Sequence, residues 1–339
     1  MTKDDRILLA HGGGGQLSDQ LIRELILPHV GGPAADALND SAYVHLGSEE
    51  LCMTTDSYVV KPLFFNGGNI GKLAVCGTVN DLAVAGAEPL ALSLGLIIEE
   101  GFPVSDLEKI LKSIGETARS CGVQVVTGDT KTVDAGAADG IFINTAGIGR
   151  LKRKDLGLDR IGVGDKILVS GTLGDHGITV MSQRKDIRFQ SPLASDCAPL
   201  NGLIAELLEV APGMRFMRDP TRGGVAATLN EIARSSGCGV VIRETEIPVD
   251  PTVRAAADML GFDVLNIANE GKVVCVVAQE DAQACLECCR KHTLGQQACL
   301  IGEIVACPND EVPWVEMETK IGGKRIVQMP YGRELPRIC

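Results

Sequence analysis

Residues 69–86 have the sequence NIGKLAVCGTVNDLAVAG, and this stretch decides the fold class because it predicts a helix buried among strands. Asn69 is a residue type that favours helix starts, and small and apolar residues follow it at helical spacing to about Gly86. Asp81 lies on the same apolar face, four residues after Gly77. A buried carboxylate is costly unless it is paired or bound to a metal, so we predict that Asp81 belongs to a functional site.

The segments on both sides of this helix predict strands that end in charged residues. An alternating strand leads into Asp56, and a strand over 123–127 leads into Gly128-Asp129-Thr130-Lys131. Between them, Ser105 and Glu108 have the spacing of a capping box and predict the start of another helix. A carboxylate and a lysine are therefore expected together at the end of a strand.

Composition limits the class of protein. The chain has 339 residues, of which 45% are apolar and 40 are glycine, and this suits a turn-rich α/β protein of two domains. Its net charge of −12 argues against nonspecific binding to nucleic acid or to an anionic membrane. No apolar run approaches the roughly 20 residues of a membrane-spanning helix. Only four apolar residues separate Arg6 from His11, so no secretory signal is expected and we predict a cytoplasmic protein.

The second half repeats the alternation of strands and helices after a charged stretch over 152–160. We expect a strand over 167–169, a helix over 199–210 and a strand after Asn269-Glu270-Gly271. The motif Asp219-Pro-Thr-Arg-Gly-Gly224 predicts a turn that opens a helix, and it suits either an anion site or a simple strand-to-helix turn. The predicted fold is α/β (α+β), with domains at 1–155 and 156–329 and a mobile tail at 330–339.

One group of cysteines has a spacing that suggests more than core packing. Cys285, Cys288, Cys289 and His292 fall within two helical turns, so they could bind a metal or line the buried side of a helix. No second cysteine or histidine pair completes a four-ligand set nearby. We therefore favour a helix that packs its thiols into the core.

The chain ends in Cys339, which brings a thiol to the part of a chain that is least often packed. A tail from Pro330 could span at most roughly 33 Å, at about 3.3 Å per residue. Such a nucleophile could reach a site on its own protein or on a partner. The alternative is an end with no role.

Aspartates recur at loops and element ends of the first half. Asp40, Asp56, Asp81 and Asp129 at this density suit one or two Mg²⁺ ions that carry phosphates. The alternative is that each one is a solvated cap or turn residue, which fits Asp40 well and Asp81 badly. Residues 67–73 do not form a Walker P-loop, so a nucleotide enzyme would need another phosphate-binding design.

These motifs together resemble the PurM-like superfamily of ATP-using enzymes. The match covers essentially the whole chain in order, and its tail Pro336-Arg-Ile-Cys339 resembles the HypE family of hydrogenase maturation factors within that superfamily. The resemblance implies a PurM-like fold whose N-terminal sheet pairs across a homodimer, with ATP near the interface. It also implies a C-terminal α/β sandwich and a flexible tail. The motifs are Gly12–Gly15, Asn39–Ala42, Thr55-Asp56, Gly77–Ala83, Gly128–Lys131 and Asp219–Gly224.

The resemblance also implies roles for single residues. The implied Mg²⁺ ligands are Asp40, Asp56, Asp81 and Asp129. Residues implied to act in catalysis are Cys339, Lys131 and Glu270, the last as a catalytic or tail-positioning carboxylate. The implied ATP-binding residues, some of which would alternatively hold the tail, are Gly12, Gly13, Gly14, Gly15, Asn80, Asp81, Thr130, Asp219, Thr221, Arg222, Gly223 and Gly224.

The activity implied by the HypE resemblance is ATP-dependent dehydration of a carbamoyl group on Cys339 to a thiocyanate, which supplies a cyanide ligand to the iron of [NiFe]-hydrogenase. The implied partners are the carbamoyltransferase HypF and an iron-carrying HypC–HypD complex, with no nucleic acid and no membrane. A selenophosphate synthetase is disfavoured because no cysteine precedes Cys52 near the glycine loop. A small-molecule kinase or synthetase would give no reason for the terminal thiol, and a nonenzymatic scaffold would not need Asp81.

Overall fold

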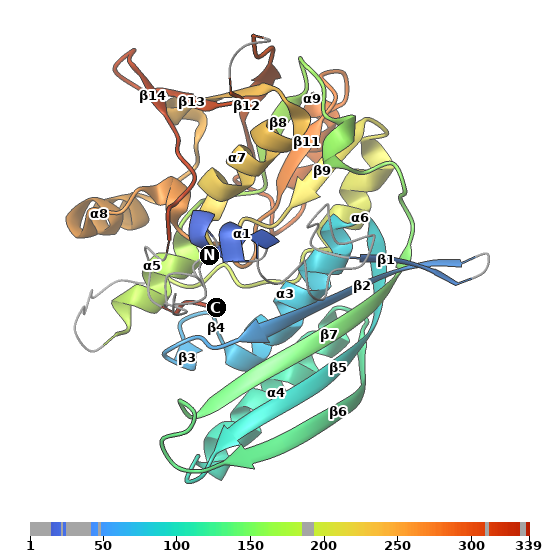
Figure 1. Cartoon of the computed structure of the whole chain (residues 1–339), viewed down its shortest axis with the longest axis vertical. Coiled ribbons are helices and arrows are strands. Elements are labelled where there is room, and N and C mark those ends of the chain that lie inside the picture. Colours follow the sequence, from blue (N-terminus) through green and yellow to red (C-terminus); the bar gives the residue numbers. More distant parts are fainter. Residues whose placement is uncertain are drawn as a thin grey trace.

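A computed structural model describes residues 15–21, 23–24, 42–46, 49–184, 193–308, 312–332 and 337–339. The predicted site residues Gly12, Gly13, Gly14 and Asp40 lie outside the described residues. Two large sheets lie one above the other in Figure 1, and helix α3 (Ile70–Val84) lies between them.

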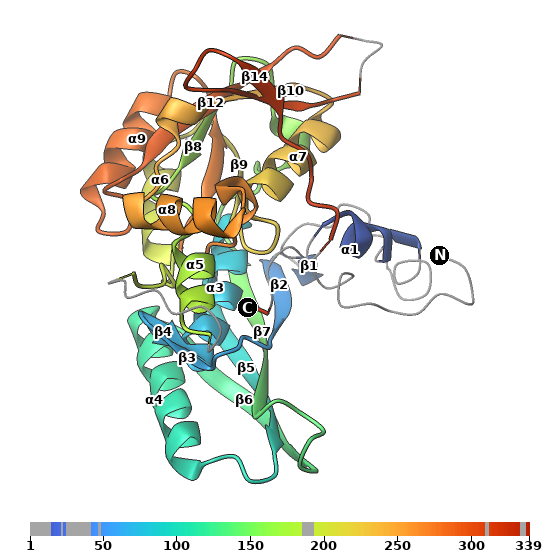
Figure 2. The same ribbon diagram turned by 90° about the vertical axis from the view of Figure 1, so that its left-hand side faces the viewer.

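The first sheet has the strand order β1-β2-β7-β5-β6 and is antiparallel except for the parallel pair β5–β6. Helices α3 and α4 (Val104–Ser120) cover one of its faces, while no described helix packs over β5 to β7 on the other, here called the open face (Figures 1 and 2). Its strands are β1 (Ala42–Leu46), β2 (Glu49–Tyr58), β5 (Ala87–Glu99), β6 (Gln124–Val133) and β7 (Ile141–Leu151).

The helix predicted from residues 69–86 is confirmed. Asn69 is its N-cap, and its side chain accepts hydrogen bonds from the backbone N–H groups of Gly71 and Lys72 at 2.8 and 3.1 Å. Every residue of α3 except Lys72 and Asp81 is buried, because the helix packs on the first sheet and also on the second half of the chain. The sequence predicted that Asp81 is buried on the apolar face of this helix. This was wrong, because its side chain is only half-buried.

The second sheet has the strand order β14-β13-β10-β12-β8-β11-β9 and carries helices on both faces. One core cluster joins the sheet to α6 and α9, and the other joins it to α5, α7, α8 and α3. The strands are β8 (Lys166–Val169), β9 (Met214–Arg218), β10 (Gly239–Arg243), β11 (Val274–Val277), β12 (Cys299–Val305), β13 (Val315–Glu318) and β14 (Lys324–Ile326). The helices are α5 (Asp175–Ser182), α6 (Asn201–Val210), α7 (Gly224–Ser236), α8 (Pro251–Leu260) and α9 (Ala282–Lys291).

Two strands are longer than the sequence predicted. β2 continues through Asp56 to Tyr58 because it pairs with β7 as far as Ile143, and β6 continues to Val133 because it pairs with β5 as far as Glu99. Asp56, Asp129 and Lys131 therefore lie within strands and not beyond their ends. Partner strands decide where a strand ends, and the local sequence does not show them.

The predicted capping box was wrong. The N-cap of α4 is Pro103, whose carbonyl accepts from Asp106 and Leu107 at 3.0 and 3.1 Å, and no side chain caps this end. Ser105 thus lies inside the first turn, where its hydroxyl cannot act as the N-cap.

The cysteines of α9 pack into the core, as the favoured interpretation predicts. Cys285 and Cys289 are fully buried, and His292 follows the helix and accepts a hydrogen bond from the N–H of Leu294 at 3.2 Å. Among the described residues, no group of three or more His, Cys, Asp or Glu side chains is arranged to hold a metal. No helix among all the described residues is long and apolar enough to cross a membrane.

The close contact of α3 with α4 depends on the absence of a side chain at Gly71. A Cβ atom there would lie 2.6 Å from the carbonyl oxygen of Ile110. We expect Gly71→Ala to destabilise the protein by about 1–3 kcal/mol in thermal or denaturant unfolding. The control is Gly115→Ala on α4, where a Cβ atom would meet only the flexible end of Arg119, at 3.3 Å. This control should stabilise by about 0.5–1 kcal/mol, and equal effects of the two variants would contradict the packing.

Candidate active site

The polar side chains of α3 connect the two halves of the chain. Asn80 is buried and donates from Nδ2 to the carbonyl oxygens of Ala198 and Glu270, at 3.2 and 3.5 Å. Its Oδ1 accepts from the N–H of Leu200 at 2.8 Å. The amide predicted to bind the cofactor is thus engaged by the protein, and it fixes the loop of Glu270 against the first domain.

Two carboxylates lie on the side of β2 that α3 covers. The Asp81 Oδ2 accepts from Thr54 Oγ1 at 2.8 Å, and Asp56 is two residues further along the same face of β2. Burial raises the pKa of Tyr58, which follows on that face, and the charges of Asp56 and Asp81 raise it further. Asp56 and Asp81 therefore form one acidic cluster between β2 and α3.

Glu270 extends this acidic cluster from the second half. Its side chain is buried, and among the described residues its Oε1 has no hydrogen-bond partner. Burial raises the pKa of Glu270 well above its ordinary value, and the nearby Cys197, Asp219, Asp196 and Asp56 raise it further. A carboxyl group in this position is a stronger base than an ordinary glutamate.

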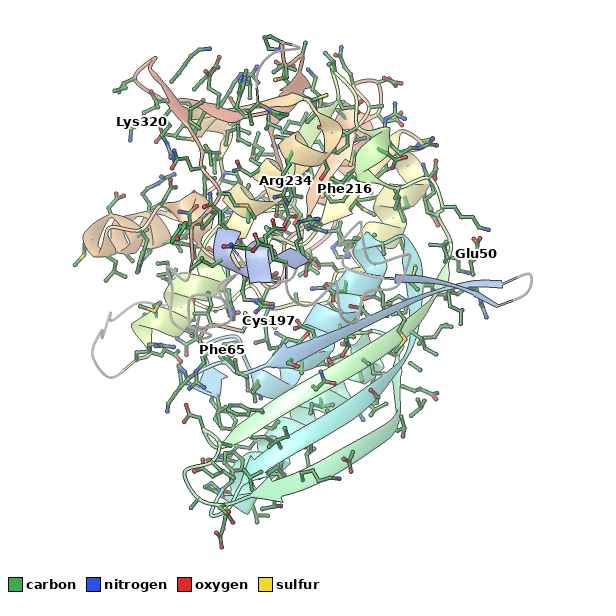
Figure 3. All side chains as sticks on the ribbon, viewed as in Figure 1. Glu50, Phe65, Cys197, Phe216, Arg234 and Lys320 are labelled. Atoms are coloured by element: carbon green, nitrogen blue, oxygen red, sulfur yellow. The ribbon has the colours of Figure 1, made fainter. Side chains whose placement is uncertain are left out.

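A buried ion pair between Asp196 and Lys272 holds the backbone of Glu270. Asp196 accepts from the N–H groups of Glu270 and Gly271 at 3.1 and 3.3 Å. Lys272 Nζ donates to the same carboxylate at 3.1 Å and lies 3.8 Å from Asp175. Figure 3 shows Cys197, which follows Asp196, at the level where the two sheets meet.

The predicted turn at 219–224 opens α7, as expected. Gly223 and Gly224 both have positive φ, and a Cβ atom on Gly224 would lie 2.4 Å from the carbonyl oxygen of Leu265. Asp219 is buried. The negative charge of Cys339 raises the pKa of Arg222, and Asp56 and Glu270 contribute in the same direction. Arg222 is thus the cation that faces both the acidic cluster and the terminal thiol.

The tail returns to this site, although the sequence predicted a mobile segment. The N–H of Val59 donates to the Cys339 carbonyl at 3.3 Å, and the N–H of Lys61 donates to the Arg337 carbonyl at 3.4 Å. This is the register of an antiparallel pair that extends β2. Figures 1 and 2 show the C-terminal end beside β2 and α3, between the two sheets.

Helix α5 and a surface loop supply three contacts to the tail that sequence analysis missed. His176 Nε2 lies 2.5 Å from the Ile338 carbonyl oxygen, and Arg184 Nη2 donates to the Arg337 carbonyl at 2.8 Å. The Arg337 guanidinium also pairs with Asp139, and the Ile338 side chain is 5% exposed within the main core. No sequence motif could have identified these residues, because two of them bind backbone atoms far away in the chain.

The start of the tail is also held. The N–H groups of Gln16 and Leu17 in α1 (Gln16–Leu21) donate to the carbonyls of Pro330 and Tyr331, at 2.9 and 3.2 Å. Gly15 is buried here, and a Cβ atom on it would lie 2.0 Å from the Pro330 oxygen. The one described residue of the predicted glycine loop thus contacts the tail.

Within one chain, Asp56 lies far from Asp129, Thr130 and Lys131. Asp56 is opposite Thr145, Thr145 is opposite Leu94, and Leu94 is opposite Gly128, so three strand spacings of roughly 14 Å in total separate β2 from β6. The side chains of Asp129 and Lys131 project from the opposite, open face, where they pair at 2.6 Å and are about 70% exposed (71% and 68%).

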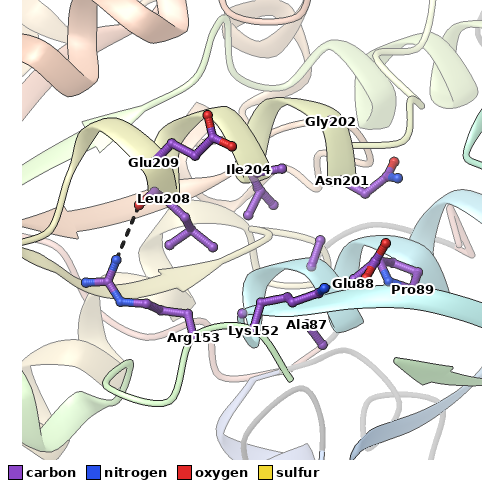
Figure 4. A pocket seen from close by; sticks show the side chains of 13 residues that line it. Ala87, Glu88, Pro89, Lys152, Arg153, Asn201, Gly202, Ile204, Leu208 and Glu209 are labelled. Carbon is purple, nitrogen blue, oxygen red and sulfur yellow. Dashed lines mark hydrogen bonds and ion pairs between the residues drawn. The ribbon is translucent and has the colours of Figure 1, made fainter. Parts of the chain in front are cut away.

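A separate hollow lies between α6 and the start of β5 (Figure 4). Arg153 crosses one end of it and donates to the Leu208 carbonyl at 3.3 Å. Of the described residues, those that line this hollow include none of the predicted site residues. The acidic cluster with Arg222 and Cys339 is therefore the candidate active site.

Comparison with known proteins defines the class first. Residues 38–151 match the N-terminal domain of AIR synthase related proteins, and residues 162–315 match their C-terminal domain. The two matches cover most of the chain and confirm the predicted PurM-like fold, so this is a protein of the AIR synthase related class.

Close relatives identify the family within this class. Carbamoyl dehydratase HypE of Rhizobium leguminosarum bv. viciae is 50% identical over 336 residues, which are 98% of this chain and 95% of the relative. A HypE–HypF complex structure has a TM-score of 0.86 at 47% identity, covering 91% of this chain and 99% of that one. A HypE structure with ATP has a TM-score of 0.82 at 45% identity, covering 98% and 100%. The chain belongs to the carbamoyl dehydratase HypE family.

The buried carboxyl group of Glu270 should make stability depend on pH. Its pKa is raised in the folded state, so the folded protein holds this proton where the unfolded chain, with a pKa of about 4.3, has lost it. The contribution of Glu270 to stability is complete below about pH 4 and is lost as pH rises. We expect the free energy of unfolding to fall less between pH 5 and pH 8 in Glu270→Gln than in the unmodified chain. The difference should be about 1.4 kcal/mol for each unit by which the pKa is raised, within that pH range.

Denaturant unfolding at both pH values measures this difference. The control is Glu280→Gln in an exposed turn, which should keep the pH dependence of the unmodified chain. An unchanged pH dependence in Glu270→Gln would contradict the buried, uncompensated carboxyl group.

Proposed function

We propose that this chain is an ATP-dependent carbamoyl dehydratase in which Cys339 carries the carbamoyl group through the reaction. The observation that carries the proposal is the return of the tail to the end of β2 near the acidic cluster, where the charge of Cys339 interacts with that of Arg222. The names of the relatives in the HypE family support the same activity. Cys339 is then a covalent substrate carrier, and the catalytic groups belong to the folded domains.

ATP is the proposed phosphoryl donor, and a related HypE structure that contains ATP supports this choice. Asp56 and Asp81 fit a Mg²⁺ site, because Mg²⁺ typically takes one or two carboxylates together with substrate phosphates and water. When bound, Mg²⁺ would neutralise charge on the phosphates. A cation here would also relieve the repulsion among the carboxylates of the cluster.

The proposed chemistry converts the carbamoyl oxygen into a leaving group. The amide oxygen of the S-carbamoyl group attacks the γ-phosphorus of ATP, an O–P bond forms, and ADP leaves. Removal of the two N–H protons and cleavage of the C–O bond then give the thiocyanate S–C≡N and inorganic phosphate. Glu270 has the raised pKa that suits a base for these protons, and Arg222 offers positive charge beside the sulfur.

We include a homodimer in the proposal because the open face of the first sheet exposes apolar side chains. Met53, Ile97 and Ile148 are 47%, 44% and 40% exposed on this face. A patch of this kind on a sheet favours a protein contact. Asp129 and Lys131 lie on the same face, so a second copy would bury them at the contact, where the predicted roles in Mg²⁺ and phosphate binding become possible.

The remaining parts of the proposal concern organisation and partners. Residues 1–155 would bind nucleotide and dimerise, 156–329 would form the second domain, and 330–339 would be the carrier tail. The HypE–HypF complex of a relative supports HypF as the carbamoyl donor, and a HypC–HypD complex would accept the cyanide. A cytoplasmic location would suit these exchanges.

The most direct test of the activity is the intact mass of the protein. After incubation with HypF, carbamoyl phosphate, ATP and Mg²⁺, we expect a carbamoyl adduct that loses the mass of one water as ATP is consumed. Cys339→Ala should give no adduct, while Cys288→Ala, which removes a half-buried thiol on α9, should behave like the unmodified chain. ATP binding by Cys339→Ala should remain, because the acidic cluster is intact. An adduct on Cys339→Ala would refute the carrier role.

The dimer is tested by placing a charge on the open face. Ile97→Lys should convert a dimer into a monomer in sedimentation velocity at micromolar concentration, because a lysine would be buried at the contact without a partner. Val163→Lys, at a loop position that is 64% exposed, should leave the dimer intact. A monomeric unmodified chain, or a dimeric Ile97→Lys, would exclude this interface.

A further inference from the structure

The last three residues occupy a dock in which each residue has a main-chain oxygen that accepts from a protein donor. Arg337 O accepts from Lys61 N and Arg184 Nη2, Ile338 O from His176 Nε2, and Cys339 O from Val59 N. Two of these donors lie in the extension of β2, and the other two belong to α5 and the residues just after it. A frayed end would not satisfy three successive carbonyls in this way.

Side chains select the sequence that can enter this dock. Ile338 is 5% exposed and belongs to the main core cluster, and the Arg337 guanidinium pairs with Asp139, which also accepts from Lys61 Nζ at 2.5 Å. Burial of the Ile338 side chain favours the docked tail through the hydrophobic effect. The dock is thus specific for an apolar residue after a cation and directly before the cysteine.

His176 is the buried member of the dock, and its environment fixes its tautomer. The ring is fully buried, with Phe65 packed edge-on at 5.5 Å. Because a carbonyl oxygen only accepts, Nε2 carries the proton that bonds Ile338 O. Nδ1 lies 2.8 Å from Ser195 Oγ, which itself accepts from the N–H of Cys197 at 3.0 Å, so the serine hydroxyl donates to Nδ1. Burial lowers the pKa of His176, which favours the same neutral ring.

We propose that His176, oriented by Ser195, is a positioning residue that latches the tail through the Ile338 carbonyl and so holds Cys339 beside Val59 at the end of β2. Ser195 and Cys197 flank Asp196, which holds the backbone of Glu270. The loop of residues 195–197 therefore positions both His176 and the backbone of Glu270. This shared loop couples the position of the tail to that of Glu270. The latch itself does not depend on the activity, but its catalytic consequence rests on the proposed function.

The latch must be reversible, because a docked cysteine cannot meet a partner protein. A neutral hydrogen bond suits that requirement, since it can be exchanged for water when the tail leaves. Releasing the tail exposes the N–H groups of Val59 and Lys61, which have tail carbonyls as acceptors only while it is docked. Their hydrogen exchange rates therefore report docking without any use of ATP.

The test compares His176→Asn with His176→Gln in the full-length protein. Gln can present an amide N–H near the position of Nε2, whereas the shorter Asn cannot. Hydrogen exchange at Val59 and Lys61 should be about tenfold faster in His176→Asn, as expected for loss of one buried hydrogen bond, and close to the unmodified rate in His176→Gln. A chain that lacks residues 337–339 supplies the rate for a fully released tail.

A second variant covers the case in which the histidine substitutions disturb α5. Arg184→Ala removes the half-buried side chain that donates to both Arg337 O and Lys61 O, and it should also raise exchange at Val59 and Lys61 several-fold. In the chain lacking 337–339, His176→Asn and His176→Gln should show equal exchange, because the latch has no tail to hold. Unmodified exchange rates in both His176→Asn and Arg184→Ala would overturn the proposal.

A kinetic readout separates the latch from the proposed activity. In single turnover of the carbamoylated protein, His176→Asn should slow loss of water about tenfold while the Kd for ATP stays unchanged, and His176→Gln should restore the rate. If the unmodified chain loses no water with ATP, the proposed function fails and the exchange result still decides the latch. If the unmodified chain reacts and both variants react equally fast, the positioning role is refuted.

Discussion

The arrangement of the site depends on the three hydrogen bonds of Asn80. This side chain is buried within α3, and it binds Ala198 O, Glu270 O and Leu200 N in the other half of the chain. An amide in this environment is costly unless all its partners are in place, so the helix and the Glu270 loop must fold together. Asp81, the next residue of α3, is thereby brought to the same junction as Glu270.

The junction gathers negative charge that stability alone would not favour. Glu270 is buried, and the charges of Asp219, Asp196 and Asp56 all raise its pKa. Lys272 forms an ion pair with Asp196. The positive charge of Arg222 interacts with the negative charges of Asp56, Glu270 and Cys339. A buried carboxyl group among like charges, such as Glu270, is typical of a functional site. There a bound cation, or a proton in transfer, offsets the negative charge of the carboxylates and of bound phosphates.

The sequence predicted what depends on local pattern. The buried helix after Asn69 and the turn at Gly223-Gly224 follow from capping residues, periodicity and glycine. The ends of β2 and β6 did not follow, because pairing with β7 and β5 extends them. The dock of the tail could not be foreseen either, since His176 and Arg184 recognise backbone carbonyl groups, which every residue presents.

The central claim is that the tail is docked with Cys339 beside Val59, at the end of β2. A disulfide trap tests this position directly: Val59→Cys should form a disulfide with Cys339 under mild oxidation, because the two residues are opposite each other in the antiparallel register. Peptide mapping by mass spectrometry identifies the linked pair. Val126→Cys, on the exposed edge strand β6, is the control and should not link to Cys339. Efficient linkage only in Val59→Cys is the expected result, and no linkage there, or equal linkage in both variants, would contradict the docked tail.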